Sequence, residues 1–166
     1  MSTSGVIADP ASNAGLLVDT NLLVLYVVGT VSQRRIETFK RTSQYTRPDY
    51  ELLVRVFGYF QALYTVPHVL AEVSNLTDLS GSDRSAARAI LKNVVTLLTE
   101  VEMPSVRAAE DPYYPRLGLT DAAIGSAARA HRCAVLTDDL DLYVQLSRDG
   151  LPVWNFTHIR AQALNL

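Results

Sequence analysis

Two short apolar segments that each end in an aspartate constrain the fold of this chain more than any other feature. They are GLLVD at 15–19 and CAVLTD at 133–138, and a helical pattern follows each of them. Short continuous apolar runs are typical of strands that are buried on both faces of a parallel sheet. Weaker strand candidates are LYTV at 63–66 and LPVWNF at 151–156. We therefore expect an α/β protein, a three-layer α/β/α sandwich with a central, mostly parallel sheet.

Helical patterns fill most of the sequence between these strands. We predict helices at about 20–28, 31–41, 48–58, 67–78, 83–98, 120–131 and 139–148. Residues 103–118 contain three prolines and are predicted to form a long connection.

The length of 166 residues is typical of one domain. We expect a flexible N-terminal tail at 1–14 and a single domain at 15–166, with a helical segment at about 31–58.

The longest apolar run, at 22–28, is too short to cross a bilayer, and the N-terminus lacks the features of an export signal, so we expect a cytoplasmic protein with no membrane contact. Because Cys133 is the only cysteine, an internal disulfide and a multi-cysteine zinc site are excluded. The net charge of −2 gives no general attraction to nucleic acid.

Four acidic residues are expected to meet at one edge of the sheet. Asp19 and Asp139 follow the two buried strands, Asp121 opens a helix with small residues, and Glu72 lies in the second turn of the helix after a weaker strand. Functional groups of open parallel sheets gather beyond the carboxyl ends of the strands.

Each acid also has a simple structural interpretation, as a helix cap, a partner of a helix dipole or a solvated side chain. Their shared position and their apolar flanks favour a cation site instead, because an unpaired charge is costly there. Carboxylates without a histidine partner match the preference of Mg²⁺ or Mn²⁺ for oxygen ligands. The three histidines, His68, His131 and His158, show no metal-ligand spacing.

Four short motifs contain these acids, and they are LLVDTN at 16–21, AEV at 71–73, LTDAAI at 119–124 and LTDDLDL at 136–142. In their order and spacing they resemble the PIN-domain proteins, which include the VapC-type ribonuclease toxins of bacterial VapBC toxin–antitoxin pairs. A T-x-D element of that family selects Asp139 after Thr137 and leaves Asp138 as the variable middle residue. The segment between the first two motifs, about 50 residues, is longer than in a compact member of the family.

The resemblance implies a Mg²⁺- or Mn²⁺-dependent endoribonuclease, and its likeness to the VapC-type toxins implies the toxin of a toxin–antitoxin pair. Asp19, Asp121 and Asp139 would be direct ligands of one or two ions that bind the scissile phosphate, and Glu72 would ligate or orient a water. Four further residues would support these ligands, and they are Thr20, Asn21, Thr137 and Asp141.

A basic segment at 31–58 is a candidate RNA-binding surface, with six basic and three acidic residues and a net charge of +3. The candidate phosphate contacts are Arg34, Arg35, Lys40, Arg41 and Arg47, and Tyr45 and Tyr50 could stack on bases. A solvated pair of amphipathic helices explains the segment equally well. It could also bind an antitoxin protein or a second subunit, and we expect a homodimer.

Other reaction classes are disfavoured, because GxSxG, Walker A and GxGxxG patterns are absent. An aspartyl phosphatase would need a second aspartate where Asn21 stands. The remaining alternative is a catalytically inert PIN-like scaffold that binds RNA or protein.

The adjacent Asp138 and Asp139 need separate roles, because successive side chains at a strand end point to opposite sides. We expect Thr137 to steady the carboxylate of Asp139 or a bound water. Asp138 is expected to be solvated or to cap the following helix.

Overall fold

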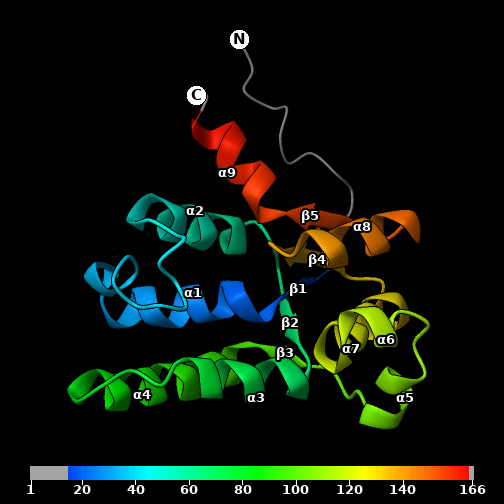
Figure 1. Cartoon of the computed structure of the whole chain (residues 1–166), viewed down its shortest axis with the longest axis horizontal. Coiled ribbons are helices and arrows are strands. Elements are labelled where there is room, and N and C mark those ends of the chain that lie inside the picture. The colour runs from blue at the N-terminus through cyan, green and yellow to red at the C-terminus, as the bar shows by residue number, and fades with distance from the viewer. Residues whose placement is uncertain (1–14, 165–166) are drawn as a thin grey trace.

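The computed structural model describes residues 15–164 and contains a five-stranded sheet in which all neighbouring strands are parallel (Figure 1). The strand order is β3-β2-β1-β4-β5. The strands are β1 (Leu16–Val18), β2 (Leu63–Thr65), β3 (Thr99–Glu100), β4 (Ala134–Thr137) and β5 (Val153–Asn155). All four predicted strands are present, whereas β3 was not predicted. The predicted tail at 1–14 lies outside the described residues.

The helices follow the strands in the alternating order that the sequence predicts. They are α1 (Thr20–Val31), α2 (Arg47–Gly58), α3 (Pro67–Leu76), α4 (Ser82–Leu97), α5 (Ser105–Ala109), α6 (Tyr114–Leu117), α7 (Leu119–His131), α8 (Leu140–Arg148) and α9 (Phe156–Leu164), with a short 3-10 helix, η2, at Gln33–Arg35.

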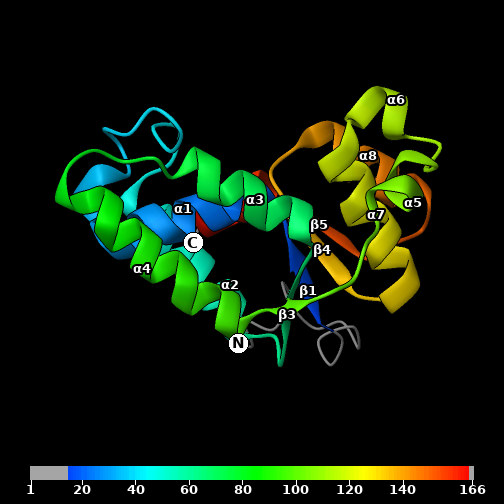
Figure 2. The ribbon, with the colours of Figure 1, turned by 90° about the horizontal axis from the view of Figure 1, so that it is seen from below.

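Helices lie on both sides of the sheet. Figure 2 shows α1 to α4 on one side of the strands and α5 to α8 on the other, while α9 leaves the edge strand β5. The chain therefore is an α/β protein with three layers and a parallel central sheet, which confirms the predicted fold class.

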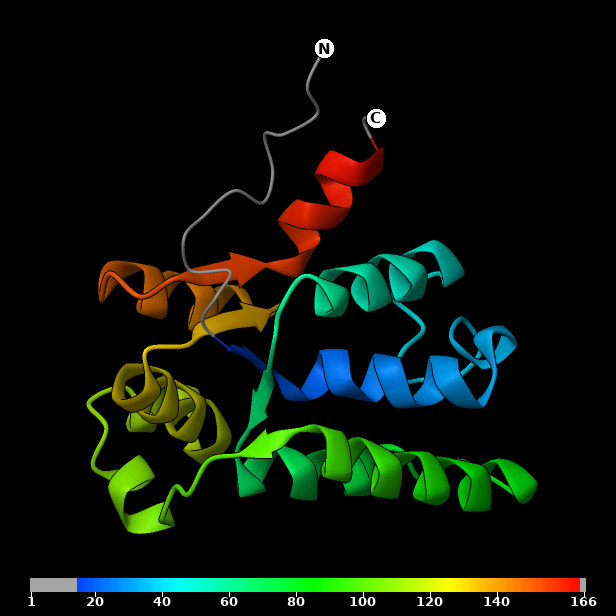
Figure 3. The ribbon, with the colours of Figure 1, turned by 180° about the vertical axis from the view of Figure 1, so that it is seen from behind.

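Helix α1 is the central helix of its layer. Viewed from behind, it lies between α2 and the pair formed by α3 and α4 (Figure 3). Most of its residues are buried, because LLVLYVV presents apolar side chains in every direction and a helix of this kind needs cover all round. With 12 residues α1 is short, and none of the helices within 15–164 could span a membrane.

The predicted helix at 31–41 is wrong, and within the segment at about 31–58 only η2 and α2, which corresponds to the predicted helix at 48–58, are helical beyond the end of α1. Helix α1 ends at Val31, η2 covers only three residues, and turns occupy 36–46 before α2 begins. Hydroxyl side chains bond locally to the backbone in these turns, and the buried Thr42 donates to the carbonyl oxygen of Ile36 at 2.7 Å. Such bonds compete with the helical pattern and explain why an apparently periodic segment turns instead.

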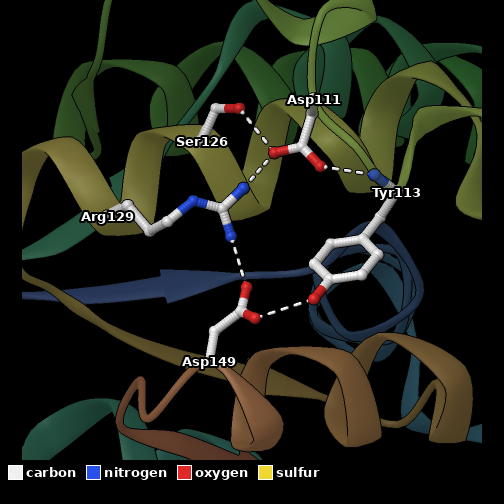
Figure 4. A network of polar contacts seen from close by, with 5 residues as sticks. All are labelled: Asp111, Tyr113, Ser126, Arg129 and Asp149. Atoms are coloured by element: carbon white, nitrogen blue, oxygen red, sulfur yellow. Dashed lines mark hydrogen bonds and ion pairs between the residues drawn. The ribbon is translucent and has the colours of Figure 1, made fainter.

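The predicted connection at 103–118 contains two short helices, α5 and α6. Helix α5 packs against α7, and a polar network fixes the same region (Figure 4). The buried carboxylate of Asp111 accepts hydrogen bonds from Arg129, from Ser126 at 3.1 Å and from the backbone N–H of Tyr113 at 2.9 Å. Arg129 also contacts Asp149 at 2.8 Å, which joins α7 to the end of α8.

Candidate functional site

A cavity of about 320 Å³ lies where α1, α3, α7 and α8 meet beyond the ends of β1 and β4, and we call it the acid cavity. Its lining includes all four predicted acids, Asp19, Glu72, Asp121 and Asp139, together with Thr20 and Asn21. The parallel topology explains this convergence, because β1 and β4 are neighbours and release their following residues at one edge.

Asp19 is the most deeply buried of these acids. It lies between β1 and α1, only 4% exposed, and its Oδ1 caps α1 by accepting the N–H of Leu22 at 3.1 Å. Its Oδ2 accepts the hydroxyl of Thr137 and the N–H of Asp138 at 3.1 Å. Burial, and next the charge of Asp138, raise the pKa of Asp19 to about 7, although these hydrogen bonds act in the opposite direction.

Asp121 enters the cavity from the first turn of α7 and is half-buried. Burial is the main cause that raises its pKa to about 7, and the charges of Asp139 and Glu72 add to the effect. Gly118 precedes α7 with a φ of 84°, a left-handed conformation that suits glycine and lets the chain turn at the cavity wall. Asp139 and Glu72 are thus both close enough to Asp121 to repel its carboxylate.

Glu72 is held by two threonine hydroxyls. Its Oε2 accepts from Thr20 at 3.0 Å and its Oε1 accepts from Thr120 at 2.6 Å. Because Thr20 follows Asp19 and Thr120 precedes Asp121, these bonds tie α3 to both neighbouring helices. The role of Thr120 was not predicted from the sequence, although Thr120 directly precedes the predicted acid Asp121 in LTDAAI, and this position could have indicated it.

Asp139 is exposed and serves as the N-cap of α8, where its Oδ1 accepts the N–H of Leu142 at 2.9 Å. The structural interpretation as a helix cap thus holds for Asp139 as well as for Asp19, and both still line the cavity. The hydroxyl of Thr137 donates to Asp19 and accepts the backbone N–H of Asp139 at 3.0 Å. Thr137 therefore steadies the Asp19 carboxylate, and the expectation that it would steady that of Asp139 is wrong.

The predicted role of Asp138, as a solvated residue or the cap of α8, is wrong too. Its half-buried carboxylate accepts the hydroxyl of Tyr45, and Asn21 lies at 3.4 Å from it. Asp139 is the N-cap because α8 begins at Leu140, one residue after the predicted start at 139. Asn21 contacts Asp138 instead of capping α1.

Asp141 does not line the acid cavity. It is exposed on α8 and pairs with Arg116 of α6 at 2.9 Å. It therefore connects two helices at the surface.

The predicted RNA-binding residues lie outside the cavity lining. Arg35 pairs with Asp83 of α4 at 2.6 Å, and Arg47 pairs with Glu51 at 3.2 Å within α2. The other three, Arg34, Lys40 and Arg41, are exposed around η2 and the following turns. Two of the five are thus already engaged by carboxylates.

The two tyrosines predicted to stack on bases differ in their exposure. Tyr45 is 1% exposed, contacts the ring of Phe156 edge-on and lies under the guanidinium of Arg160. Tyr50 is half-buried against Tyr26. Tyr45 therefore offers no free face for stacking on a base, whereas the stacking role of Tyr50 stays a prediction.

The carboxylates of the acid cavity have the oxygen donors that hard divalent cations prefer. Burial, and next the charges of neighbouring carboxylates, raise the pKa of Asp19 and of Asp121, and a bound cation would relieve this electrostatic cost. Within residues 15–164, no three His, Cys, Asp or Glu side chains are gathered closely enough to form a metal-holding group. The donor chemistry thus fits a divalent cation, while the side chains are oriented toward threonine and backbone donors.

Comparison with protein-family models finds no match, and neither does comparison with curated proteins. Among solved structures, the crystal structure of PAE2754 from Pyrobaculum aerophilum is similar, with a TM-score of 0.54 and 16% sequence identity. The match covers 92% of this chain and 97% of that one. At this identity the similarity concerns the fold alone, and it agrees with the α/β architecture described above.

Proposed function

We propose that the chain is a Mg²⁺- or Mn²⁺-dependent endoribonuclease whose catalytic residues are Asp19, Glu72, Asp121 and Asp139. The observation that carries the proposal is the convergence of these acids, from four segments far apart in sequence, on one cavity. Two of them have a pKa raised to about 7, and such perturbed groups in a cavity are typical of functional sites. The motif resemblance to PIN-domain ribonucleases supplies the reaction class.

The resemblance to PIN-domain ribonucleases supplies the roles of the side chains, and their contacts are compatible with these roles. Asp19, Asp121 and Asp139 would hold the cation, and Glu72 would ligate it or orient a water from its place between two threonines. When bound, such an ion lowers the pKa of the attacking water and neutralises charge on the phosphate. Thr137 fixes the orientation of Asp19 through its hydroxyl.

A cleavage assay with two matched variants on α8 tests this proposal. Asp139→Asn keeps a side chain that caps helices well but removes the charge, so we expect cleavage of a labelled single-stranded RNA with Mn²⁺ to be lost while stability is kept. Asp141→Asn changes an exposed aspartate of the same helix that pairs only with Arg116, and cleavage should persist. Chelation of the metal should abolish cleavage by the parent protein.

The assignment is wrong if Asp139→Asn cleaves at the parental rate, or if Asp141→Asn loses as much activity. A second candidate function is an inert scaffold that binds RNA or protein, and it is favoured because no three His, Cys, Asp or Glu side chains within 15–164 form a group that could hold a metal ion. RNA binding by the parent protein without cleavage in either Mg²⁺ or Mn²⁺ would select the scaffold.

We extend the proposal to the toxin of a toxin–antitoxin pair that acts as a homodimer on cellular RNA in the cytoplasm. This extension rests on the resemblance to VapC-type toxins. A small neighbouring open reading frame that encodes a DNA-binding domain with a disordered tail would support it. Size-exclusion chromatography of the protein alone tests the dimer.

A further inference from the structure

A second cavity, of about 190 Å³, lies beside the edge strand β5, between α8 and α9. We call it the aromatic cavity and define it by Tyr143, Trp154, Asn155, His158 and Ile159. Among the described residues 15–164, none that lines it carries a carboxylate. A negatively charged chain could therefore approach it without direct repulsion.

The rings around the aromatic cavity are held in place by one another. Trp154 packs against Phe60 with ring centroids 5.2 Å apart, and the rings of Tyr143 and His158 meet edge-on at 5.3 Å and 87°. Trp154 and Tyr143 are half-buried, and His158 is exposed. Three flat rings held in this way form a surface on which another planar ring can stack, because little side-chain freedom is lost when a ligand binds.

One polar group of the cavity has a fixed orientation. Asn155 is buried, and its Oδ1 accepts the backbone N–H of His158 at 3.2 Å, at the start of α9. Because the oxygen is engaged by an N–H donor, the amide nitrogen is the end that remains to donate. A planar ligand with acceptor atoms on its edge fits this combination of rings and one donor.

The aromatic cavity and the acid cavity share the start of α8. Asp139 lines the acid cavity, and Tyr143, one helical turn later, lines the aromatic one. The backbone N–H of Tyr143 donates to the carbonyl oxygen of Asp139 at 3.0 Å, which fixes this one-turn separation. Figure 1 shows α8 beside both β4 and β5, the two strands whose ends border the cavities. A chain that places a phosphate at the acids can therefore place a neighbouring group at the rings.

We propose that the aromatic cavity binds one base of single-stranded RNA, in a nucleotide that flanks the phosphate held at the acid cavity. Base stacking on Tyr143, Trp154 and His158 supplies the binding free energy, and the Asn155 amide contacts the base edge. The position relative to the cleaved bond rests on the proposed ribonuclease function, whereas base binding itself does not.

Trp154 is the only tryptophan of the chain, so its fluorescence reports directly on this cavity. The probe is a short oligoadenylate titrated into the full chain with a chelator present, so that no cleavage occurs. We expect saturable quenching, and we expect His158→Ala and Tyr143→Leu each to weaken binding at least about five-fold, because each removes a stacking ring. The matched control is His131→Ala, which changes an exposed histidine at the far end of α7 and should bind as the parent does.

Three results would overturn the proposal: no quenching by oligoadenylate, equal quenching by inorganic polyphosphate, or parental affinity in both ring variants. Fluorescence that changes with protein concentration alone would indicate that a second copy covers the cavity, and it would also contradict base binding. The exposed position of His158 makes its variant safe for folding, so that loss of binding there cannot be ascribed to unfolding. The titration needs no metal, so the two proposals can fail separately. Quenching by oligoadenylate without cleavage once metal is added would overturn only the ribonuclease proposal. Cleavage of RNA without quenching would overturn only the proposal of base binding at the aromatic cavity.

Discussion

Threonine hydroxyls determine how the carboxylates of the acid cavity are held. Glu72 is bound by Thr20 and Thr120, and Asp19 is bound by Thr137. A hydroxyl can donate to a carboxylate without adding charge, so it orients the oxygen atoms and leaves the negative potential of the site in place. Burial raises the pKa of Asp121, and the like charges of Asp139 and Glu72 add to the effect.

The raised pKa of Asp121 leads to a prediction on the pH dependence of stability. The pKa of Asp121 rises from 3.8 to about 7 on folding, so its contribution to stability is fully present below the lower value and is lost as the pH rises through about 7. Asp121→Asn removes the charge and should stabilise the metal-free protein by about 1–2 kcal/mol at pH 8, with little gain at pH 4. Chemical denaturation at the two pH values measures the difference.

Asp141→Asn is the control for that measurement, because Asp141 is exposed and the change should stay within about 0.5 kcal/mol at either pH. Destabilisation of Asp121→Asn at pH 8 would show that the Asp121 charge is compensated in the folded protein.

At the scale of single residues, the sequence predicts which side chains lie near one another but not which of their atoms form hydrogen bonds. The four acids could be predicted, because each follows a strand or opens a helix at one edge of the sheet. The contact between Asp138 and Tyr45 could not be predicted, because it joins residues 93 positions apart and depends on the turns that replace the predicted helix at 31–41.

At the scale of elements, the position of α7 depends on the ion pairs of Arg129. Its guanidinium contacts the buried Asp111 before α6 and Asp149 after α8. Three segments are thus joined at the helix that delivers Asp121 to the acid cavity (Figure 4).

Breaking the buried pair should cost far more than changing the exposed one. Arg129→Met leaves the Asp111 carboxylate buried without its cation, and we expect a loss of about 3 kcal/mol in the free energy of unfolding. The double variant Arg129→Met/Asp111→Asn should recover part of this loss, because the uncompensated charge is gone. Asp149→Asn is the matched control and should cost less than about 1 kcal/mol. Additive losses in the double variant would contradict the coupling.

The elements with strong periodic patterns could be predicted from the sequence, and the short ones could not. Helix α4 and the buried strands β1 and β4 have clear apolar patterns. Strand β3 has only two residues, Thr99 and Glu100, and forms by pairing with β2, which no local pattern reveals. Helices α5 and α6 are short and lie in a segment with three prolines, one of them inside α6, and packing against α7 outweighs local preference there.

At the scale of the whole molecule, the topology explains why one edge of the sheet carries the candidate chemistry. The first and fourth strands lie side by side at the centre, so residues more than a hundred positions apart in sequence share one cavity. The two cavities flank the start of α8, and this arrangement would let one RNA chain use both.

Binding of Mn²⁺ to the whole protein tests the central claim, that the acid cavity is a divalent-cation site, most directly. Calorimetric titration of the parent protein should show saturable binding at millimolar Mn²⁺ or below. The same metal should raise the melting temperature more than sodium at equal ionic strength, since it binds only the folded carboxylates. Asp121→Asn should lose most of the heat of binding and most of the rise in melting temperature. A parent protein that shows no heat of binding at millimolar Mn²⁺, or an Asp121→Asn variant that binds as tightly as the parent, would contradict the claim.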